Sequence, residues 1–191
     1  MAKNKKFTVK LKRKRTQKTD YNKRLAYVKS KKTRLVIRPH TNNITLQFIE
    51  YAPQGDKVIV TTHSQELKKL NWDYHLGNIP TAYLTGLLCG KKAKQKNVKE
   101  AILDLGLHKS VKGTRIYAAL KGVVDAGLKV PHAEKVFPPE EVLEGKSIER
   151  YANLLSKNPE KHQKQFSTYI KKSSPEKISQ KFREVKHKIL S

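Results

Sequence analysis

The sequence predicts an α/β fold in which a three-stranded antiparallel meander is extended by a further strand and packed against helices. Three β-rich segments separated by short polar turns predict the meander, and two helical segments with apolar stripes around one more strand predict the packed layer. Strongly basic ends predict a basic N-terminal arm and a helical C-terminal extension. We expect the arm with a short helix over residues 1–32, the core over 33–130 and the extension over 131–191.

The charge is concentrated at the two ends of the chain. Residues 1–38 carry sixteen Lys and Arg side chains against one acid, whereas residues 39–155 carry sixteen bases and twelve acids. Residues 156–191 carry ten bases and three acids, which completes the net charge of +26. Because like charges repel within a folded body, such a density indicates a polyanionic partner, and nucleic acid is the leading candidate.

The N-terminal arm contains few apolar side chains. Ordering each backbone residue costs about 1–2 kcal/mol, so we expect residues 1–19 to be disordered until a partner holds them. Alternation in FTVKLK is typical of an extended strand lying along RNA. A short helix is predicted to begin near Asp20, with Thr19 or Asp20 as its cap and with an apolar face made by Tyr21, Leu25 and Val28.

The strands and helices of the core follow from residue type and spacing. Strands are predicted in TRLVIRP, NITLQFIEY and DKVIVTTHS, which are rich in β-branched residues. A helix opens at Asn78 with Pro80 in its first turn and runs to residue 95. A fourth strand over 99–107 then precedes an amphipathic helix over 114–128.

The extension beyond residue 130 has a thinner apolar pattern. It predicts a loop, a short helix and two basic helices broken around Ser173-Ser174-Pro175. We expect this tail to pack on a partner rather than on the rest of the chain.

Several functional classes find little support in the sequence. The single Cys89 has no partner thiol and suits a reducing compartment, and no apolar run predicts a membrane span or a signal peptide, so we expect a cytosolic protein. The glycine spacing is wrong for a P-loop and the seven histidines are scattered. We therefore expect no catalytic residues, no cofactor and no metal.

Two alternative functions remain open. A meander followed by a strand and a helix is also how ribonuclease-H-like folds begin, so a metal-dependent nuclease would need acids such as Glu50, Asp104 and Asp125 to converge. Asp104 faces away from such a site if its neighbours are core, which weighs against the nuclease. A non-specific basic DNA-binding protein is the second alternative.

Aromatic and basic residues alternate in KKLNWDYHLGN. Exposed rings of Trp72, Tyr74 and His75 could stack on unpaired bases while Lys68 and Lys69 hold phosphates. Equally, Trp72 could fill the edge of the core.

Two further basic clusters lie at predicted helix ends. The cluster of Lys91, Lys92 and Lys94 either contacts RNA or complements the dipole of its helix. Near the next helix, Lys109, Lys112 and Arg115 surround a glycine and resemble a phosphate-binding turn.

The runs RLVIRPHTNNITLQFIEYAPQGDKVIVTTHSQELKKLNWDYHLGNIPTAYLTGLLCGKKA and EAILDLGLHKSVKGTRIYAALKGVVDAGLKVPH carry a resemblance over residues 19–151. They are similar to the 5S-rRNA-binding proteins of the large ribosomal subunit, number eighteen of the universal series, in their archaeal form. The resemblance implies a mixed α/β core related to ribonuclease H, no enzymatic activity, and a basic arm that binds 5S rRNA. It also implies attachment of 5S rRNA to 23S rRNA in the central protuberance, beside neighbouring 5S-binding proteins.

The same resemblance assigns rRNA contacts to three segments of this chain. Those implied contacts are Lys12, Arg13, Lys14, Arg15 and Lys18 in the arm, Tyr21 and Arg24 in the first helix, and Arg34 and Arg38 in the first strand.

Overall fold

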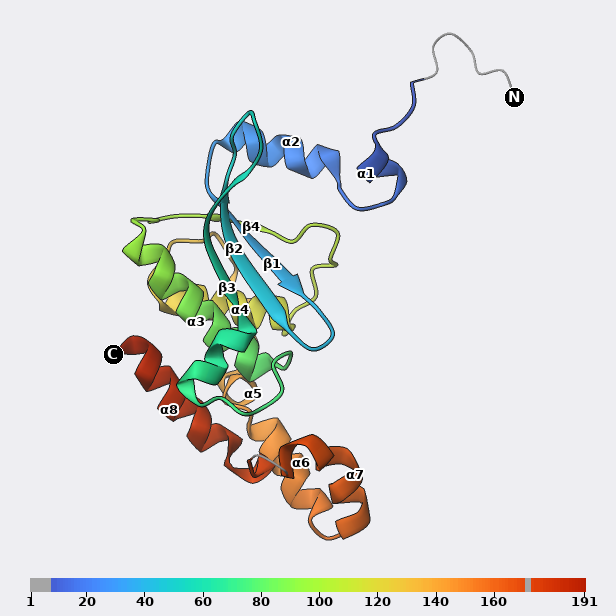
Figure 1. Cartoon of the computed structure of the whole chain (residues 1–191), viewed down its shortest axis with the longest axis vertical. Helices are drawn as coiled ribbons and strands as arrows, with labels where there is room; N and C mark the ends of the chain where they lie inside the picture. The colour runs from blue at the N-terminus through green and yellow to red at the C-terminus, as the bar shows by residue number, and fades with distance from the viewer. Residues whose placement is uncertain (1–7, 171–172) are drawn as a thin grey trace, which may run out of the picture.

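The computed structural model describes residues 8–170 and 173–191. Its sheet consists of β1 (Arg34–Pro39), β2 (Ile44–Glu50), β3 (Lys57–His63) and β4 (Ile102–Asp104). The strand order is β3-β2-β1-β4, in which β2 pairs antiparallel with both β3 and β1, and β4 pairs parallel with β1. The chain therefore has an α/β fold with a mixed four-stranded sheet, which confirms the predicted meander and its added strand (Figure 1).

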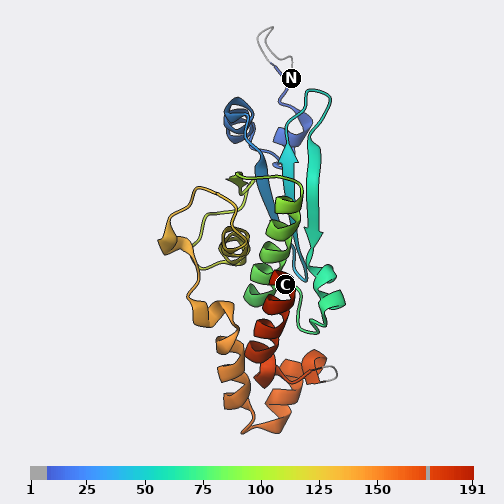
Figure 2. The same ribbon diagram turned by 90° about the vertical axis from the view of Figure 1, so that its left-hand side faces the viewer.

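Two helices cover one face of the sheet. They are α3 (Ile79–Gln95) and α4 (Arg115–Asp125), and Figure 2 shows them beside the strands in a separate layer. The Asn78 side chain caps α3 by accepting a hydrogen bond from the Thr81 amide at 2.9 Å, as its position before Pro80 predicts. The buried side chains of β1 and β2, such as Leu35 and Phe48, fill the space under these helices.

The two helices cross at glycines. A Cβ atom on Gly86 would lie 2.0 Å from the carbonyl oxygen of Ala119, and one on Gly122 would lie 2.1 Å from that of Tyr83. Backbone occupies both positions, so the two helices pack at this distance only because neither glycine has a side chain.

The C-terminal part consists of α5 (Glu140–Leu143), α6 (Lys146–Leu155), α7 (Pro159–Ile170), η3 (Pro175–Lys177) and α8 (Ile178–Leu190). The side chains of Ile178, Phe182, Val185 and Ile189 on α8 belong to the main hydrophobic core. The ring centroid of Phe182 lies 5.4 Å from that of Tyr83 on α3. The expectation that this tail packs on a partner is therefore wrong for α8, because its apolar stripe covers α3 of the same chain. No helix of the described ranges 8–170 and 173–191 is long and apolar enough to cross a membrane.

Within the described residues 8–32, the N-terminal segment forms two helices rather than the single predicted one. Helix α2 (Tyr21–Ser30) begins where predicted, and the Asp20 side chain accepts hydrogen bonds from the amides of Asn22 and Lys23. A helical turn, α1 (Lys12–Arg15), precedes it within the arm that we expected to be disordered or extended. Of the predicted strand in FTVKLK, Phe7 lies outside the described residues, and residues 8–11 form no strand. On α2, Leu25 is 56% exposed, so it does not join the apolar face predicted for it.

The connecting segments complete the chain. Helix η1 (Ser64–Leu70) follows β3 directly, and η2 (Glu134–Val136) lies between α4 and α5. The side chain of His63 and that of Glu66 form a reciprocal cap at the start of η1. This fixes the direction of the loop that leads to α3.

Candidate nucleic-acid interface

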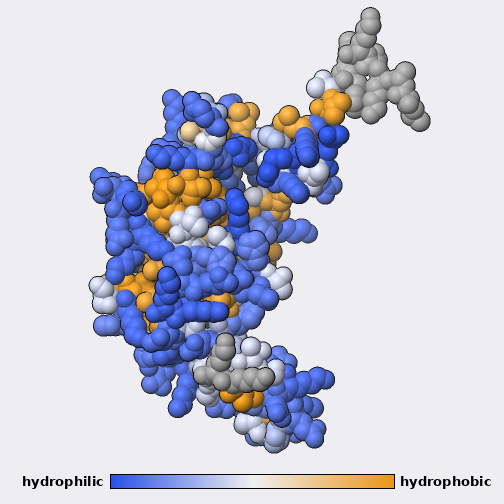
Figure 3. Space-filling view, viewed as in Figure 1, coloured by the Kyte–Doolittle hydropathy of each residue, from blue (hydrophilic) through white to orange (hydrophobic). Residues whose placement is uncertain are grey.

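A cleft of about 330 Å³ lies at the end of the sheet where α2 is found. The segment 13–27, β1 and the loop after β4 contribute its lining. Seven of the lining side chains are basic or histidine: Arg13, Lys18, Lys23, Arg24, Arg34, Arg38 and His108. Hydrophilic residues dominate the surface over α1 and α2 in the space-filling view (Figure 3). Three carboxylates also line the cleft, namely Asp20, Asp56 and Asp104.

The basic arm residues meet solvent. All five that the sequence singles out are exposed: Lys12, Arg13, Lys14, Arg15 and Lys18. Arg13 Nε donates a hydrogen bond to Thr19 Oγ1 at 2.8 Å, which ties α1 to the start of α2. Four consecutive bases in one helical turn spread their charges around it, so the segment presents cations in several directions at the mouth of the cleft.

Arg24 and Arg34 reach the same carboxylate from different elements. Arg24 Nη2 lies 3.0 Å from Asp56 Oδ2, and Arg34 Nη2 lies 2.7 Å from the same oxygen. Arg34 Nη1 also lies 2.9 Å from Asp104 Oδ2. The Arg34 side chain is only 7% exposed, whereas that of Arg24 is 39% exposed. Arg34 is therefore a buried ion-pair partner, and both of its terminal nitrogens are taken by carboxylates, which leaves little of the side chain for the expected rRNA contact.

The remaining predicted residues of the cleft differ in accessibility. Arg38 is exposed near the end of β1, and Tyr21 is half-buried at the start of α2. Nearby, Tyr27 places its hydroxyl 3.4 Å from the Leu103 carbonyl oxygen, and burial followed by the charge of Asp104 raises the pKa of this phenol. Tyr27 thus stays neutral and supports α2 from beneath.

The aromatic loop does not present the rings that we expected. Trp72 is fully buried, and its Nε1 donates to Thr81 Oγ1 at 2.8 Å. Tyr74 is buried too, and its hydroxyl donates to the Ser174 carbonyl oxygen at 2.7 Å. The prediction that these two rings stack on bases is therefore wrong, because each ring fills the core and its polar atom is hydrogen-bonded there. His75 remains exposed.

The other basic clusters divide into exposed and structural members. Lys68, Lys69 and Lys94 are exposed, Lys91 is half-buried, and Lys92 forms an ion pair with Glu66. Burial raises the pKa of Glu66, but the hydrogen bond from Lys92 and that from the His63 amide outweigh it, so the net shift is downward. The end of α3 is thus fastened to η1.

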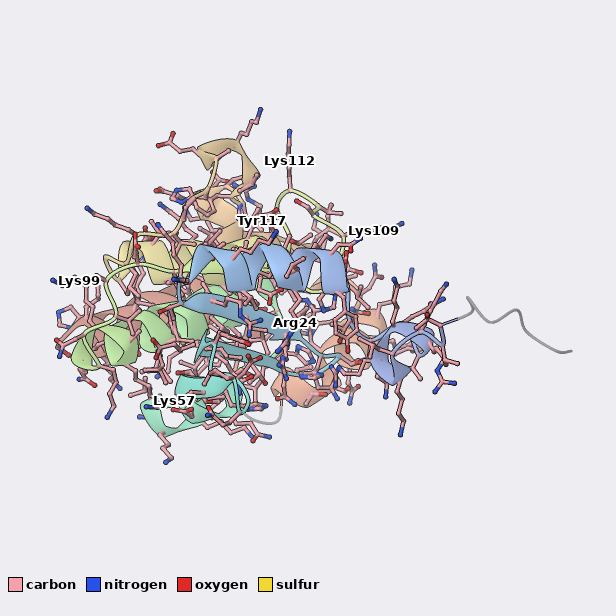
Figure 4. All side chains as sticks on the ribbon, turned by 90° about the horizontal axis from the view of Figure 1, so that it is seen from above. Arg24, Lys57, Lys99, Lys109, Lys112 and Tyr117 are labelled. Atoms are coloured by element: carbon pink, nitrogen blue, oxygen red, sulfur yellow. The ribbon has the colours of Figure 1, made fainter. Side chains whose placement is uncertain are left out.

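The predicted phosphate-binding turn is not formed. Arg115 Nη1 donates to the carbonyl oxygens of His40 and Gly77, at 3.0 and 2.9 Å, so its charge joins two loops. The Gly113 amide donates to the Val136 carbonyl oxygen at 3.0 Å and is not free for an anion. Lys109 and Lys112 are exposed and, viewed from above, lie on the other side of α2 from Lys57 (Figure 4).

Comparisons with known proteins identify the family of this chain. The family model described as "Ribosomal large subunit proteins 60S L5, and 50S L18" matches residues 5–101 and 91–133. The "Large ribosomal subunit protein uL18" of Methanococcus maripaludis is 46% identical over 192 residues, which cover the whole of both chains. The chain belongs to this L5/L18 family. It is accordingly a protein of the large ribosomal subunit, and members of the L5/L18 family are structural proteins rather than enzymes.

Membership of the L5/L18 family leaves neither alternative function supported. The acids considered for a nuclease also have other partners: Asp104 pairs with Arg34, and Asp125 accepts from the Tyr83 hydroxyl at 2.8 Å and pairs with Lys121 at 3.0 Å. Glu50 is exposed at the end of β2. Among residues 8–170 and 173–191, no group of three or more His, Cys, Asp or Glu side chains could hold a metal ion.

Proposed function

We propose that this protein binds 5S rRNA with its arm and the cleft under α2. We further propose that it helps attach 5S rRNA to 23S rRNA in the central protuberance, beside neighbouring 5S-binding proteins. One observation carries the proposal: bases from the arm, from α2 and from β1 converge on one end of the sheet. Family membership supports an rRNA partner for these bases.

In the proposed mechanism, the basic side chains supply the affinity for rRNA, and the folded core fixes where they lie. Bases that neutralise phosphates release condensed counterions, which drives binding and makes it sensitive to salt. The folded sheet and α3 hold α2 and β1 at fixed positions, so the pattern of charges matches a folded RNA rather than any polyanion. The arm adds cations at the mouth of the cleft.

The contacts that we assign fall into two groups. In the cleft and on the segments beside it we assign 5S rRNA to Lys12, Arg13, Lys14, Arg15, Lys18, Tyr21, Lys23, Arg24, Arg38, Lys109 and Lys112. Away from the lining of the cleft, we assign further rRNA contacts to the exposed or half-buried Lys68, Lys69, His75, Lys91 and Lys94.

We also retain two proposals about organisation. The order β3-β2-β1-β4, with β4 parallel to β1, supports a ribonuclease-H-like core. The functional parts that we propose are the arm and α2 over residues 1–32, the core over 33–130 and the extension over 131–191, whose α8 also covers α3.

Deletion of residues 1–19 tests the proposal. Helix α1 contributes no buried residue, so the shortened chain should melt at the temperature of the full chain. Its dissociation constant for 5S rRNA should rise by about 100-fold or more at fixed salt, because several phosphate contacts are lost. An unchanged dissociation constant would count decisively against the proposed function.

A further inference from the structure

We infer that Asp56 is a positioning residue for RNA binding, although its negative charge lies in a cleft that we assign to phosphates. This inference rests on the proposed function and deepens it. It explains why a cleft built from bases contains a carboxylate that two arginines share.

Asp56 lies in the turn between β2 and β3 and is one hub of a four-residue network. Its Oδ2 receives Arg24 of α2 at 3.0 Å and Arg34 of β1 at 2.7 Å. Arg34 continues the network to Asp104 of β4 at 2.9 Å. Two arginines and two aspartates make the network neutral, so it adds no net attraction for RNA.

The network connects the elements that present the proposed contacts. Asp104 Oδ1 accepts the Gly106 amide at 2.9 Å, and Gly106 has a φ of +57° that turns the chain into the loop with Lys109 and Lys112. At the opposite end, Asp56 holds Arg24 and hence α2. One chain of charges therefore sets the positions of α2, the β2–β3 turn and the loop after β4.

The four side chains of the network differ in burial, and its Arg24 end is the most open to solvent. The side chains of Arg34 and Asp104 are 7% and 13% exposed, whereas Arg24 is 39% exposed at the open end. Only one terminal nitrogen of Arg24 is taken by Asp56. The guanidinium is thus held at one corner and offers its remaining N–H groups to a phosphate in a fixed direction, which the planar fork favours.

Figure 4 shows Arg24 on the side of α2 that faces the strands. Without Asp56, Arg24 would keep its charge but lose its direction, and it would have to be ordered at the moment of binding. If the cleft acted by its net charge alone, loss of Asp56 should tighten RNA binding, because removal of a carboxylate makes the cleft more positive.

Whether Asp56→Asn weakens or tightens RNA binding separates the positioning role from the purely electrostatic role. The probe is the 5S rRNA of Methanococcus maripaludis, the organism of the 46% identical relative, titrated with the full chain at fixed salt. We expect Asp56→Asn to weaken binding by about tenfold or more, the loss typical of one misplaced charge-assisted contact. Equal or tighter binding by Asp56→Asn would overturn the inference.

Glu50→Gln is the matched control. Glu50 is the last residue of β2, at the other end of the turn that holds Asp56, and it is exposed but does not line the cleft. The substitution Glu50→Gln removes the same negative charge but frees no arginine from an ion pair, so the affinity for 5S rRNA should stay equal or rise slightly. Asp56→Glu keeps the charge and shifts the carboxylate by one methylene; it should also weaken binding, and it remains informative if Asp56→Asn unfolds.

A double-mutant cycle with Arg24→Gln distinguishes positioning from general destabilisation. If Asp56 acts through Arg24, the double variant should bind no worse than Arg24→Gln alone. Additive losses would overturn the inference and indicate a structural role only. Failure of the unchanged chain to bind 5S rRNA would instead overturn the proposed function, so the two failures are distinguishable.

Discussion

Removal of four cations from the cleft should flatten the salt dependence of 5S rRNA binding. The perturbation is the replacement of Arg13, Lys18, Lys23 and Arg38 by glutamine, four residues that line the cleft from three segments. None of them is buried. The fold should therefore tolerate the change, and the effect should appear in RNA binding rather than in the melting temperature.

The size of the effect follows from the number of charges. Each phosphate neutralised contributes about 0.7–0.9 to the slope of log K against log salt, so four lost contacts reduce the slope by about 3. Over a fourfold rise in salt, for instance from about 50 to about 200 mM, the unchanged protein should lose about 60-fold more affinity than the variant. Fluorescence anisotropy of labelled 5S rRNA at several KCl concentrations measures both slopes.

A control with the same charge loss shows whether position matters. Lys157, Lys161, Lys164 and Lys177 are exposed on and around α7, at the opposite end of the molecule from α2 (Figure 1). Their replacement by glutamine should leave the slope for 5S rRNA close to that of the unchanged protein. Equal slopes for the cleft variant and the unchanged protein, or an equal loss in the control, would refute the reasoning.

Three further outcomes test the structure itself. Gly122→Ala should destabilise the fold by more than about 3 kcal/mol in denaturant titrations, because the new methyl would lie 2.1 Å from the Tyr83 carbonyl oxygen. Trp72→Phe, which removes the hydrogen bond to Thr81, should cost about 1–3 kcal/mol yet leave the 5S rRNA dissociation constant unchanged; weaker RNA binding at equal folding would contradict the buried role. Burial raises the pKa of Cys89 to about 12, so iodoacetamide at pH 8 should modify it only after unfolding, which mass spectrometry detects.

Acid titration gives one more outcome. The pKa of Glu66 is lowered in the folded state, so the Glu66–Lys92 pair contributes fully above the ordinary value of 4.5 and loses its contribution as the pH falls through the lower folded value. Glu66→Gln should therefore reduce stability more at pH 7 than at pH 3. An equal loss at both pH values would contradict this assignment.

Sequence patterns predicted the features that depend on local chemistry. Asn78 and Asp20 lie where helix caps are required, and both accept amide hydrogen bonds there. The meander followed from alternating side chains and short turns, whose physical basis extends over only a few residues. The basic end could be located as well, since charge needs no fold to be counted.

The features that sequence reasoning missed depend on tertiary contacts. Arg34 looks like any other base of a basic segment until β4 and the β2–β3 turn bring two carboxylates to it. Ile178, Phe182 and Val185 show a helical stripe in the sequence, but nothing local reveals that α3 is the surface that it covers. A usable signal did exist for Asp56, which is the one acid between the β2 and β3 segments of the sequence.

Competition between RNAs and DNA tests the central claim most directly. Labelled 5S rRNA bound to the full chain at about 150 mM salt would be challenged with unlabelled 5S rRNA or with duplex DNA of equal charge. If the cleft and arm recognise a folded rRNA, duplex DNA should require at least about 1,000-fold more competitor, as is typical of specific over non-specific binding. Equal displacement by both competitors would contradict the account.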